Sequence, residues 1–158
     1  MAFDIIDVPG DGDCLYHAVI TAFLQKYNLL LTRTTQRLRR ALATFIRSQG
    51  ITDMAGGDAV HRLTTGGYGE DFEVRKLTEL LSVVLRSRVC IMVFNGRPGV
   101  PNKYRWQTFS PDFAKVHTAA SRQRRCGYTI HLFNSGQGAS EHFRVLHDRN
   151  HKATKWLQ

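Results

Sequence analysis

The chain has 158 residues, of which 42% are hydrophobic and 22% charged, so it is long enough for one domain with an apolar core. No run of about 18 apolar residues occurs, which excludes a membrane-spanning helix, and residues 1–4 lack the start of a secretory signal. The formal net charge of +9 is uneven, with 7 basic and 9 acidic side chains in residues 1–74 but 15 and 4 in residues 75–158. The basic half could attract nucleic acid, although a solvated face on part of a larger protein is the favoured explanation, and we expect a cytoplasmic monomer.

The predicted helices lie mainly in the first half of the chain. Residues 3–8 are expected to be extended, and a turn-forming run at 9–13 leads into a helix that begins near Cys14. A second helix is predicted for 35–48 and a third for 70–85, each from apolar residues at helical spacing. The second should expose Arg37, Arg39, Arg40 and Arg47, and the third should bury Leu77, Leu80, Leu81, Val84 and Leu85.

The predicted strands lie mainly in the second half. Apolar runs predict strands at 89–94, 128–133 and 142–146, the first buried on both faces. Residues 51–69 are expected to be a loop with room for a short helix, and 97–127 a packed loop or short strands. This order predicts an α+β fold with one small sheet.

Three cysteines occur, at 14, 90 and 126. Their odd number and wide spacing argue against a disulfide framework and against a cysteine-rich zinc site. Cys90 lies in an apolar strand and is expected to be a core thiol, whereas Cys126 follows two arginines in a loop.

Cys14 has the setting of a nucleophile. It follows the run Gly10-Asp11-Gly12-Asp13 and opens a helix, whose positive end should lower the thiol pKa. N–H groups of such a loop can bind the oxygen that becomes negative when a carbonyl is attacked. The alternative interpretation is a small buried residue at a helix start.

A cysteine nucleophile also needs an imidazole. His142 starts a strand after a glycine turn, where a side chain can project at a rim. His17 is expected to pack or to support the site, and His131 to be structural or to line it. His147 and His151 have the spacing of a helical metal site, but their stretch is too polar for a helix. His61 and His117 lie in loops without a recognisable context.

Three blocks of the sequence resemble the OTU (ovarian tumour) family of cysteine proteases. Residues 10–18, Gly-Asp-Gly-Asp-Cys-Leu-Tyr-His-Ala, are similar to its nucleophile motif. Residues 68–70, Tyr-Gly-Glu, resemble its aromatic-Gly-acid segment, and Ser-Gly-Gln at 135–137 with His-Phe-Arg-Val-Leu at 142–146 resembles its terminal histidine strand. The blocks keep the family order over residues 8–147 and are closest to viral members.

The resemblance implies a small papain-like OTU domain, with helices packed around a central, mostly antiparallel sheet. We expect one domain over 1–158, with a core at about 3–147 and a basic tail at 148–158. It implies a deubiquitinase that removes ubiquitin or a ubiquitin-like protein, without metal or cofactor. Chain 1–158 would be part of a viral polyprotein or a pathogen effector acting in a host cytosol.

The resemblance also assigns roles to individual residues. Cys14 would be the nucleophile, His142 the general base, and Asp11 with the N–H of Cys14 the oxyanion hole. Tyr68 and Gly69 would line a channel for a Gly-Gly tail. Glu70, with Asp71 or Glu73, could contact the basic tail of ubiquitin, although favourable interaction with the helix dipole explains these acids better.

One position departs from the family pattern. Many members carry Asp or Asn two residues after the histidine, whereas this chain carries Arg144, whose guanidinium has no acceptor for the imidazole proton. We predict that Asp7 orients the ring instead, with Asp4 and Asn134 as alternatives.

Two other functions remain open at this point. The scaffold could be a basic binding module for RNA or an acidic partner, with weak or lost catalysis. It could also be a protease that processes its own viral polyprotein.

Overall fold

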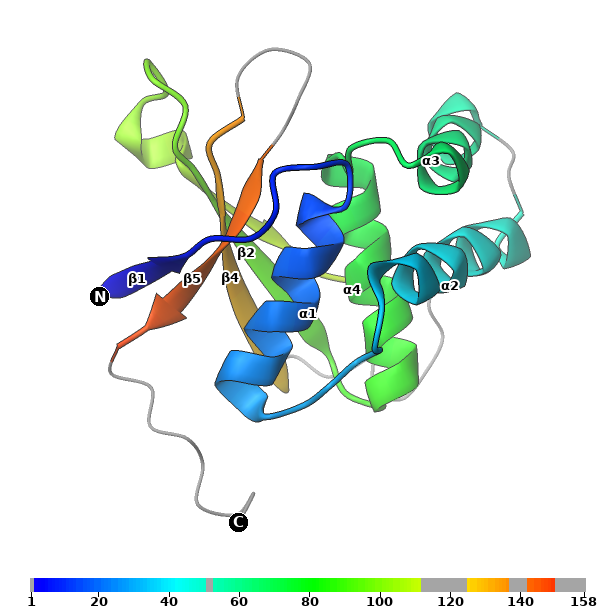
Figure 1. Cartoon of the computed structure of the whole chain (residues 1–158), viewed down its shortest axis with the longest axis horizontal. Coiled ribbons are helices and arrows are strands. Elements are labelled where there is room, and N and C mark those ends of the chain that lie inside the picture. Colours follow the sequence, from blue (N-terminus) through cyan, green and yellow to red (C-terminus); the bar gives the residue numbers. More distant parts are fainter. Residues whose placement is uncertain (1, 51–52, 112–124, 137–141, 150–158) are drawn as a thin grey trace.

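The computed structural model describes residues 2–50, 53–111, 125–136 and 142–149, which form four helices, one short 3-10 helix and a five-stranded sheet (Figure 1). None of the described helices is long and apolar enough to cross a membrane. The elements in chain order are β1 (Phe3–Ile6), α1 (Cys14–Tyr27), α2 (Thr35–Ser48), α3 (Met54–Thr65), α4 (Asp71–Leu85), β2 (Val89–Asn95), η1 (Asn102–Tyr104), β3 (Trp106–Phe109), β4 (Tyr128–Asn134) and β5 (Phe143–Asp148).

The sheet is mixed, with the strand order β1-β5-β4-β2-β3. Only the central pair β2·β4 is parallel, and the other three pairs are antiparallel. The predicted α+β fold with a mostly antiparallel sheet is therefore confirmed. In the β1·β5 pair Ile6 lies opposite Val145, so the segment that follows β1 runs beside the beginning of β5.

The helices form two groups. Helices α1 and α4 pack against the strands, and α2 and α3 pack together at the side of the molecule away from β1 (Figure 1). The core lies between the first group and the sheet and includes fully buried Leu15, Phe23, Leu77, Ile91 and Leu132. The first residue of α1, Cys14, belongs to this core, which fixes its backbone against the sheet.

Three helices match the sequence prediction, and α3 is longer than expected. Gly56 and Gly57 in its first turn lower its helix propensity, which made residues 51–69 resemble a loop. The helix is capped by the Asp53 carboxylate, which accepts a hydrogen bond from the Gly56 N–H at 2.8 Å. It ends at Gly66, whose φ of +79° is the left-handed conformation that glycine adopts readily.

The buried face of α4 differs from the prediction. Val84 is 62% exposed, while Thr78 and Ser82 are buried. The two hydroxyls donate to backbone carbonyls of the same helix, which removes the cost of burying them. The buried face of α4 therefore lies at a different position around the helix from the one that the apolar residues predicted, because polar residues form part of it.

The sheet contains a short strand in a stretch where the sequence left a packed loop or short strands open, and a covalent link that the sequence did not predict. β3 lies within the stretch 97–127 and pairs with β2. A disulfide joins Cys90 to Cys126, with Cα atoms 5.8 Å apart, so the expectation of unpaired thiols there is wrong. The parallel register places Tyr128 beside Val89, which brings the chain entering β4 next to the start of β2.

Candidate functional site

Cys14 lies at the end of the loop that connects β1 to α1. Its side chain is 0% exposed, and its sulfur accepts a hydrogen bond from the Phe143 N–H at 3.5 Å. Cys14 is not part of a disulfide. This contact places the thiol beside the backbone of the residue that follows His142, although 129 positions separate Cys14 from Phe143 in the sequence.

The ring of His142 lies between the nucleophile loop and Asp7. Its Nε2 is 3.2 Å from Oδ1 of Asp7. The edge of the ring formed by Cε1 and Nδ1 lies against Gly10 of the nucleophile loop, where an added Cβ atom would lie 3.1 Å from Cε1 and 3.2 Å from Nδ1. Nε2 therefore meets a carboxylate that can orient the ring, and the Cε1–Nδ1 edge lies against the loop that precedes Cys14.

The two alternative orienting residues are engaged elsewhere. Asp4 pairs with Arg149 at 2.8 Å. The Asn134 side chain accepts a hydrogen bond from the Gly136 N–H at 2.9 Å and so stabilises the turn after β4. Of the three candidates, Asp7 is the one that contacts the imidazole of His142.

Burial raises the pKa of the Cys14 thiol. The Phe143 N–H acts in the opposite direction but does not outweigh the loss of solvation. The expected lowering of this pKa by the helix N-terminus is therefore not found. Formation of a thiolate here therefore requires a base that takes the proton, which is the role predicted for His142.

Asp11 organises the nucleophile loop. Its carboxylate accepts a hydrogen bond from the Asp13 N–H at 2.9 Å, and its carbonyl accepts one from the Cys14 N–H at 3.1 Å. The Cys14 N–H, expected as an oxyanion donor, is thus engaged within the turn. A substrate oxygen would have to replace the Asp11 carbonyl to use it.

Tyr68 and Gly69 border the same loop. The Tyr68 hydroxyl donates to the Gly10 carbonyl at 3.2 Å. Gly69 is buried against Leu15, and a Cβ atom there would overlap that side chain. The glycine is therefore required by close packing behind the nucleophile, and its role in a substrate channel stays a prediction.

The acidic residues at the start of α4 have structural partners. Glu70 and Glu73 form a reciprocal capping box with each other's backbone N–H. Arg62 makes two bonds to the fully buried Glu73 and one ion pair of 3.4 Å to Glu70. Glu70 remains exposed, so contact with a substrate stays a prediction for it, whereas Glu73 is a core residue.

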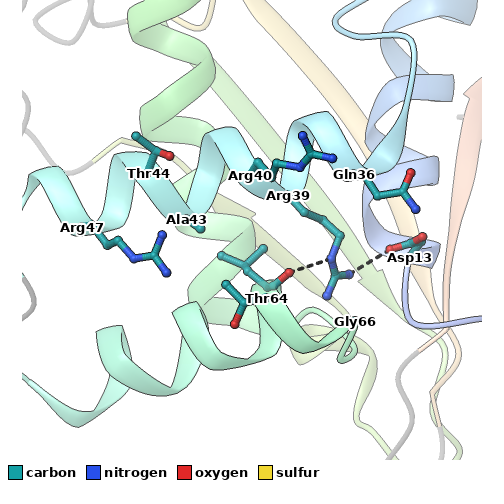
Figure 2. A pocket seen from close by; sticks show the side chains of 10 residues that line it. Asp13, Gln36, Arg39, Arg40, Ala43, Thr44, Arg47, Thr64 and Gly66 are labelled. Carbon is teal, nitrogen blue, oxygen red and sulfur yellow. Dashed lines mark hydrogen bonds and ion pairs between the residues drawn. The ribbon is translucent and has the colours of Figure 1, made fainter.

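The side chain of Arg39 binds the nucleophile loop. The sequence analysis missed this role because it expected Arg39 to be exposed to solvent. It is 4% exposed, lines a pocket of about 480 Å³ and reaches from α2 toward Asp13 (Figure 2). Its guanidinium donates five hydrogen bonds, equal to its five N–H groups. The acceptors are the Asp13 carboxylate and the carbonyls of Gly12, Arg62, Leu63 and Gly67.

The sequence contains a pattern that could have identified Arg39 as a buried residue. It lies next to Leu38 and three residues before Leu42, within the stripe of α2 that the structure buries. A single arginine within an apolar stripe can mark a buried residue that binds backbone carbonyls.

The other histidines differ in their surroundings. His131 lies on β4, with ring contacts to Phe3 and Trp106, so it is structural. His17 is half-buried, and its ring lies within 4.8 Å of carboxylate oxygens of Asp11 and Asp13. The Asp13 carboxylate already binds Arg39 and Thr35, which explains its position without a metal.

Comparisons with known proteins identify the fold. No family model matches the sequence, and no curated protein matches it significantly. The structure is similar to an OTU deubiquitinase from Wolbachia pipientis wMel, with a TM-score of 0.59 and 20% identity over 99% of this chain and 94% of the other. A ubiquitin-bound form of that enzyme matches with a TM-score of 0.56 and 18% identity, over 95% and 98%. The OTU domain of OTUD1 matches with a TM-score of 0.54 and 18% identity, over 92% and 86%. The chain therefore has the fold of the OTU domains.

Proposed function

We propose that this chain is a thiol-dependent deubiquitinase that hydrolyses the isopeptide bond between the C-terminal glycine of ubiquitin, or of a ubiquitin-like protein, and its conjugate. The observation that carries the proposal is the contact of the Cys14 sulfur with the Phe143 N–H, beside an imidazole held by Asp7. The fold supports it, since a ubiquitin-bound OTU deubiquitinase has the same architecture. The cytosol, where such conjugates occur, is the proposed site of action.

The first half of the reaction forms a thioester. The Cys14 thiol gives its proton to His142, and the thiolate attacks the carbonyl carbon of the terminal glycine. The resulting oxyanion is stabilised by N–H groups of the nucleophile loop once the turn at Asp11 has opened. The protonated imidazole then gives its proton to the departing lysine amine, and the C–N bond breaks.

The second half regenerates the enzyme. His142 accepts a proton from a water molecule as the oxygen attacks the thioester carbon. The C–S bond breaks, the sulfur recovers a proton from the imidazolium, and ubiquitin leaves with a free carboxylate. Asp7 keeps the same ring orientation in both halves, because the imidazole acts alternately as base and acid.

A covalent probe tests this function. Ubiquitin carrying an electrophile in place of its terminal carboxylate should form a stable adduct with the chain, visible as a mass increase of one ubiquitin. Cys14→Ala should abolish the adduct, because it removes the nucleophile. A Cys90→Ser/Cys126→Ser double variant is the control and should still react through Cys14.

Two outcomes would contradict the proposal. An adduct that persists in Cys14→Ala would show that another nucleophile is involved. Failure of the folded chain to react with ubiquitin or ubiquitin-like probes would remove the proposed activity, and salt-sensitive binding of RNA by the same sample would favour a basic binding module.

A further inference from the structure

The carboxylate of Asp7 has two partners, and the second is Arg144. The Arg144 Nε donates to Oδ1 of Asp7 at 3.0 Å, and His142 contacts the same oxygen at 3.2 Å. The guanidinium also reaches the hydroxyl of Ser135 through Nη1 at 3.4 Å. Arg144 thus links the carboxylate beside the imidazole to the end of β4.

The sheet register explains why these residues meet. Ile6 lies opposite Val145 in the antiparallel β1·β5 pair, so one further step in the same register brings Asp7 opposite Arg144. Side chains two apart on a strand lie on the same face, so Arg144 shares its face with His142. The three side chains therefore lie together on one face, across two neighbouring strands.

We propose that Arg144 is a positioning residue that holds Asp7 against His142, so that the orienting acid comes from the segment after β1 instead of from β5. This inference rests on the proposed function, for which an oriented imidazole is needed. Arg144 cannot accept the imidazole proton itself, because a guanidinium has no acceptor. It acts through the carboxylate it holds.

The exposure of Asp7 makes such support necessary. Its side chain is 73% exposed, compared with 32% for Arg144 and 22% for His142. An exposed carboxylate on a loop exchanges freely between rotamers and water, and one hydrogen bond to an imidazole restrains it weakly. The hydrogen bond from Arg144, anchored at Ser135, restricts the same oxygen to the position beside the ring. Hydrogen bonds from His142 and Arg144 also keep the pKa of Asp7 below its usual value.

The chain provides a matched control. Arg149 follows β5 and pairs with Asp4 on β1, so it makes the same type of exposed cross-strand ion pair far from His142. Arg144→Met and Arg149→Met make the same chemical change in these two pairs. Only the first removes a partner of the Asp7 carboxylate.

The rate at which iodoacetamide alkylates Cys14 provides a readout that needs no substrate. Both other cysteines are replaced by serine, and the rate is followed from pH 5 to 9. Among the described residues, the titratable and charged side chains around Cys14 and His142 include Asp7, Asp11, Asp13, His17, Tyr68 and Arg144. Arg144→Met should lower the rate near neutral pH about tenfold, while Arg149→Met should keep the wild-type profile.

A double-mutant cycle separates positioning from a merely structural role. In an Asp7→Ala background, Arg144→Met should have no further effect, because the carboxylate it holds is gone. Arg144→Asp in the same background should restore most of the lost rate, because residue 144 shares a face with His142. Thermal unfolding of every variant shows whether a change in rate reflects loss of structure.

The cycle has results that overturn the inference. Equal effects of Arg144→Met with and without Asp7 would show that Arg144 does not act through this carboxylate. A wild-type rate of Cys14 alkylation in the folded Arg144→Met variant would also show that Arg144 does not act through Asp7. The ubiquitin probe could fail to label the protein while the alkylation rates still show the expected coupling between Arg144 and Asp7. That result would refute the proposed substrate and leave the role of Arg144 standing.

Discussion

The carboxylate of Asp7 is the part of the site most directly tested by substitution. Asp7→Ala should lower kcat for a fluorogenic ubiquitin substrate by about 10²-fold, because the imidazole loses the group that orients it. Asp7→Asn should retain part of that rate, since the amide oxygen can still accept a hydrogen bond from the ring. The thermal unfolding midpoint should change little in either variant, because the side chain is exposed. Full activity of Asp7→Ala would exclude the orienting role while leaving the roles of Cys14 and His142 open.

The lowered pKa of Asp7 leads to a prediction about the pH dependence of activity. Because the folded value lies below the unfolded one, near 3.8, the stabilising effect of the carboxylate is complete above pH 3.8 and disappears only as the pH falls through the lower folded value. Protonation of Asp7 therefore should not contribute to the acid limb of kcat/KM above about pH 4. Asp7→Asn should lower the plateau of that profile without moving its acid limb, and a shift of one unit or more would contradict this account.

Sequence reasoning performs unevenly at the scale of residues. Cys14 could be singled out from its local setting, whereas His142 and Asp7 were singled out through the family resemblance; contacts of the structure link Asp7 to His142 and Cys14 to the backbone of Phe143. The partners of Asp13 and Asp7 could not be identified, since Arg39 and Arg144 act through contacts between segments far apart in the chain. The pKa of the thiol was also misjudged, because burial depends on the whole core.

At the scale of elements, Arg39 joins α2, the end of α3 and the nucleophile loop, so its substitution tests how these segments are held together. Arg39→Met should destabilise the fold by roughly 3 kcal/mol, since it leaves one carboxylate and four carbonyls without their donor. Arg39→Lys should recover part of that loss, because an ammonium replaces the charge but not the five-donor geometry.

The control for this prediction lies on the same helix. Arg40 is exposed in the pocket of Figure 2, so Arg40→Met should change stability by less than about 0.5 kcal/mol. Urea unfolding of the three variants provides the comparison. Equal losses for Arg39→Met and Arg40→Met would show that helix surface charge, and not the buried network, is responsible.

His131 on β4 should make the stability of the protein depend on pH. Burial lowers its pKa to about 4 from 6.5, so between these values the unfolded chain binds more protons than the folded one. Stability should therefore fall as the pH drops from 6.5 toward 4, by an amount on the order of 2 kcal/mol after allowance for partial exposure. His131→Gln should remove this part of the pH dependence, measured by urea unfolding at pH 4.5 and 7. An unchanged slope would show that other groups cause it.

The two elements that the sequence indicated only as alternatives to a loop, α3 and β3, share a physical cause. The helix α3 begins with weak helix formers and is held by Arg39 and by the ion pairs of Arg62 with α4. The strand β3 is short and has a single neighbour, β2. Both are stabilised by tertiary contacts, whereas α1, α2 and β2 have enough local apolar pattern to be predicted.

At the scale of the whole molecule, the site depends on the pairing of two strands that come from opposite ends of the chain and form one edge of the sheet. β1 and β5 pair although they lie near opposite ends of the chain, and this pairing brings Asp7, Cys14 and His142 to one place. The family resemblance predicted this arrangement, but local sequence patterns could not, because strand order is a property of the complete fold.

The disulfide adds a long-range link to the same sheet. It connects the start of β2 to the segment that enters β4 and closes a loop with a sequence separation of 36. A link of this size restricts the unfolded chain and should stabilise the protein by about 2–4 kcal/mol. Its formation requires an oxidising environment, so in a reducing cytosol the two cysteines should be thiols.

Reduction should therefore lower stability without impairing the site. Cys90 lies at the beginning of β2, whereas His142 lies beside Ser135, just after the end of β4, so the two are at opposite ends of the parallel pair. Dithiothreitol should lower the urea midpoint of the wild-type protein but not that of Cys126→Ser, and both should react with the ubiquitin probe under native conditions. Thiol titration of the denatured, oxidised chain should find Cys14 alone. Three titratable thiols in an oxidised sample, with no effect of reductant on the midpoint, would show that the bridge does not form.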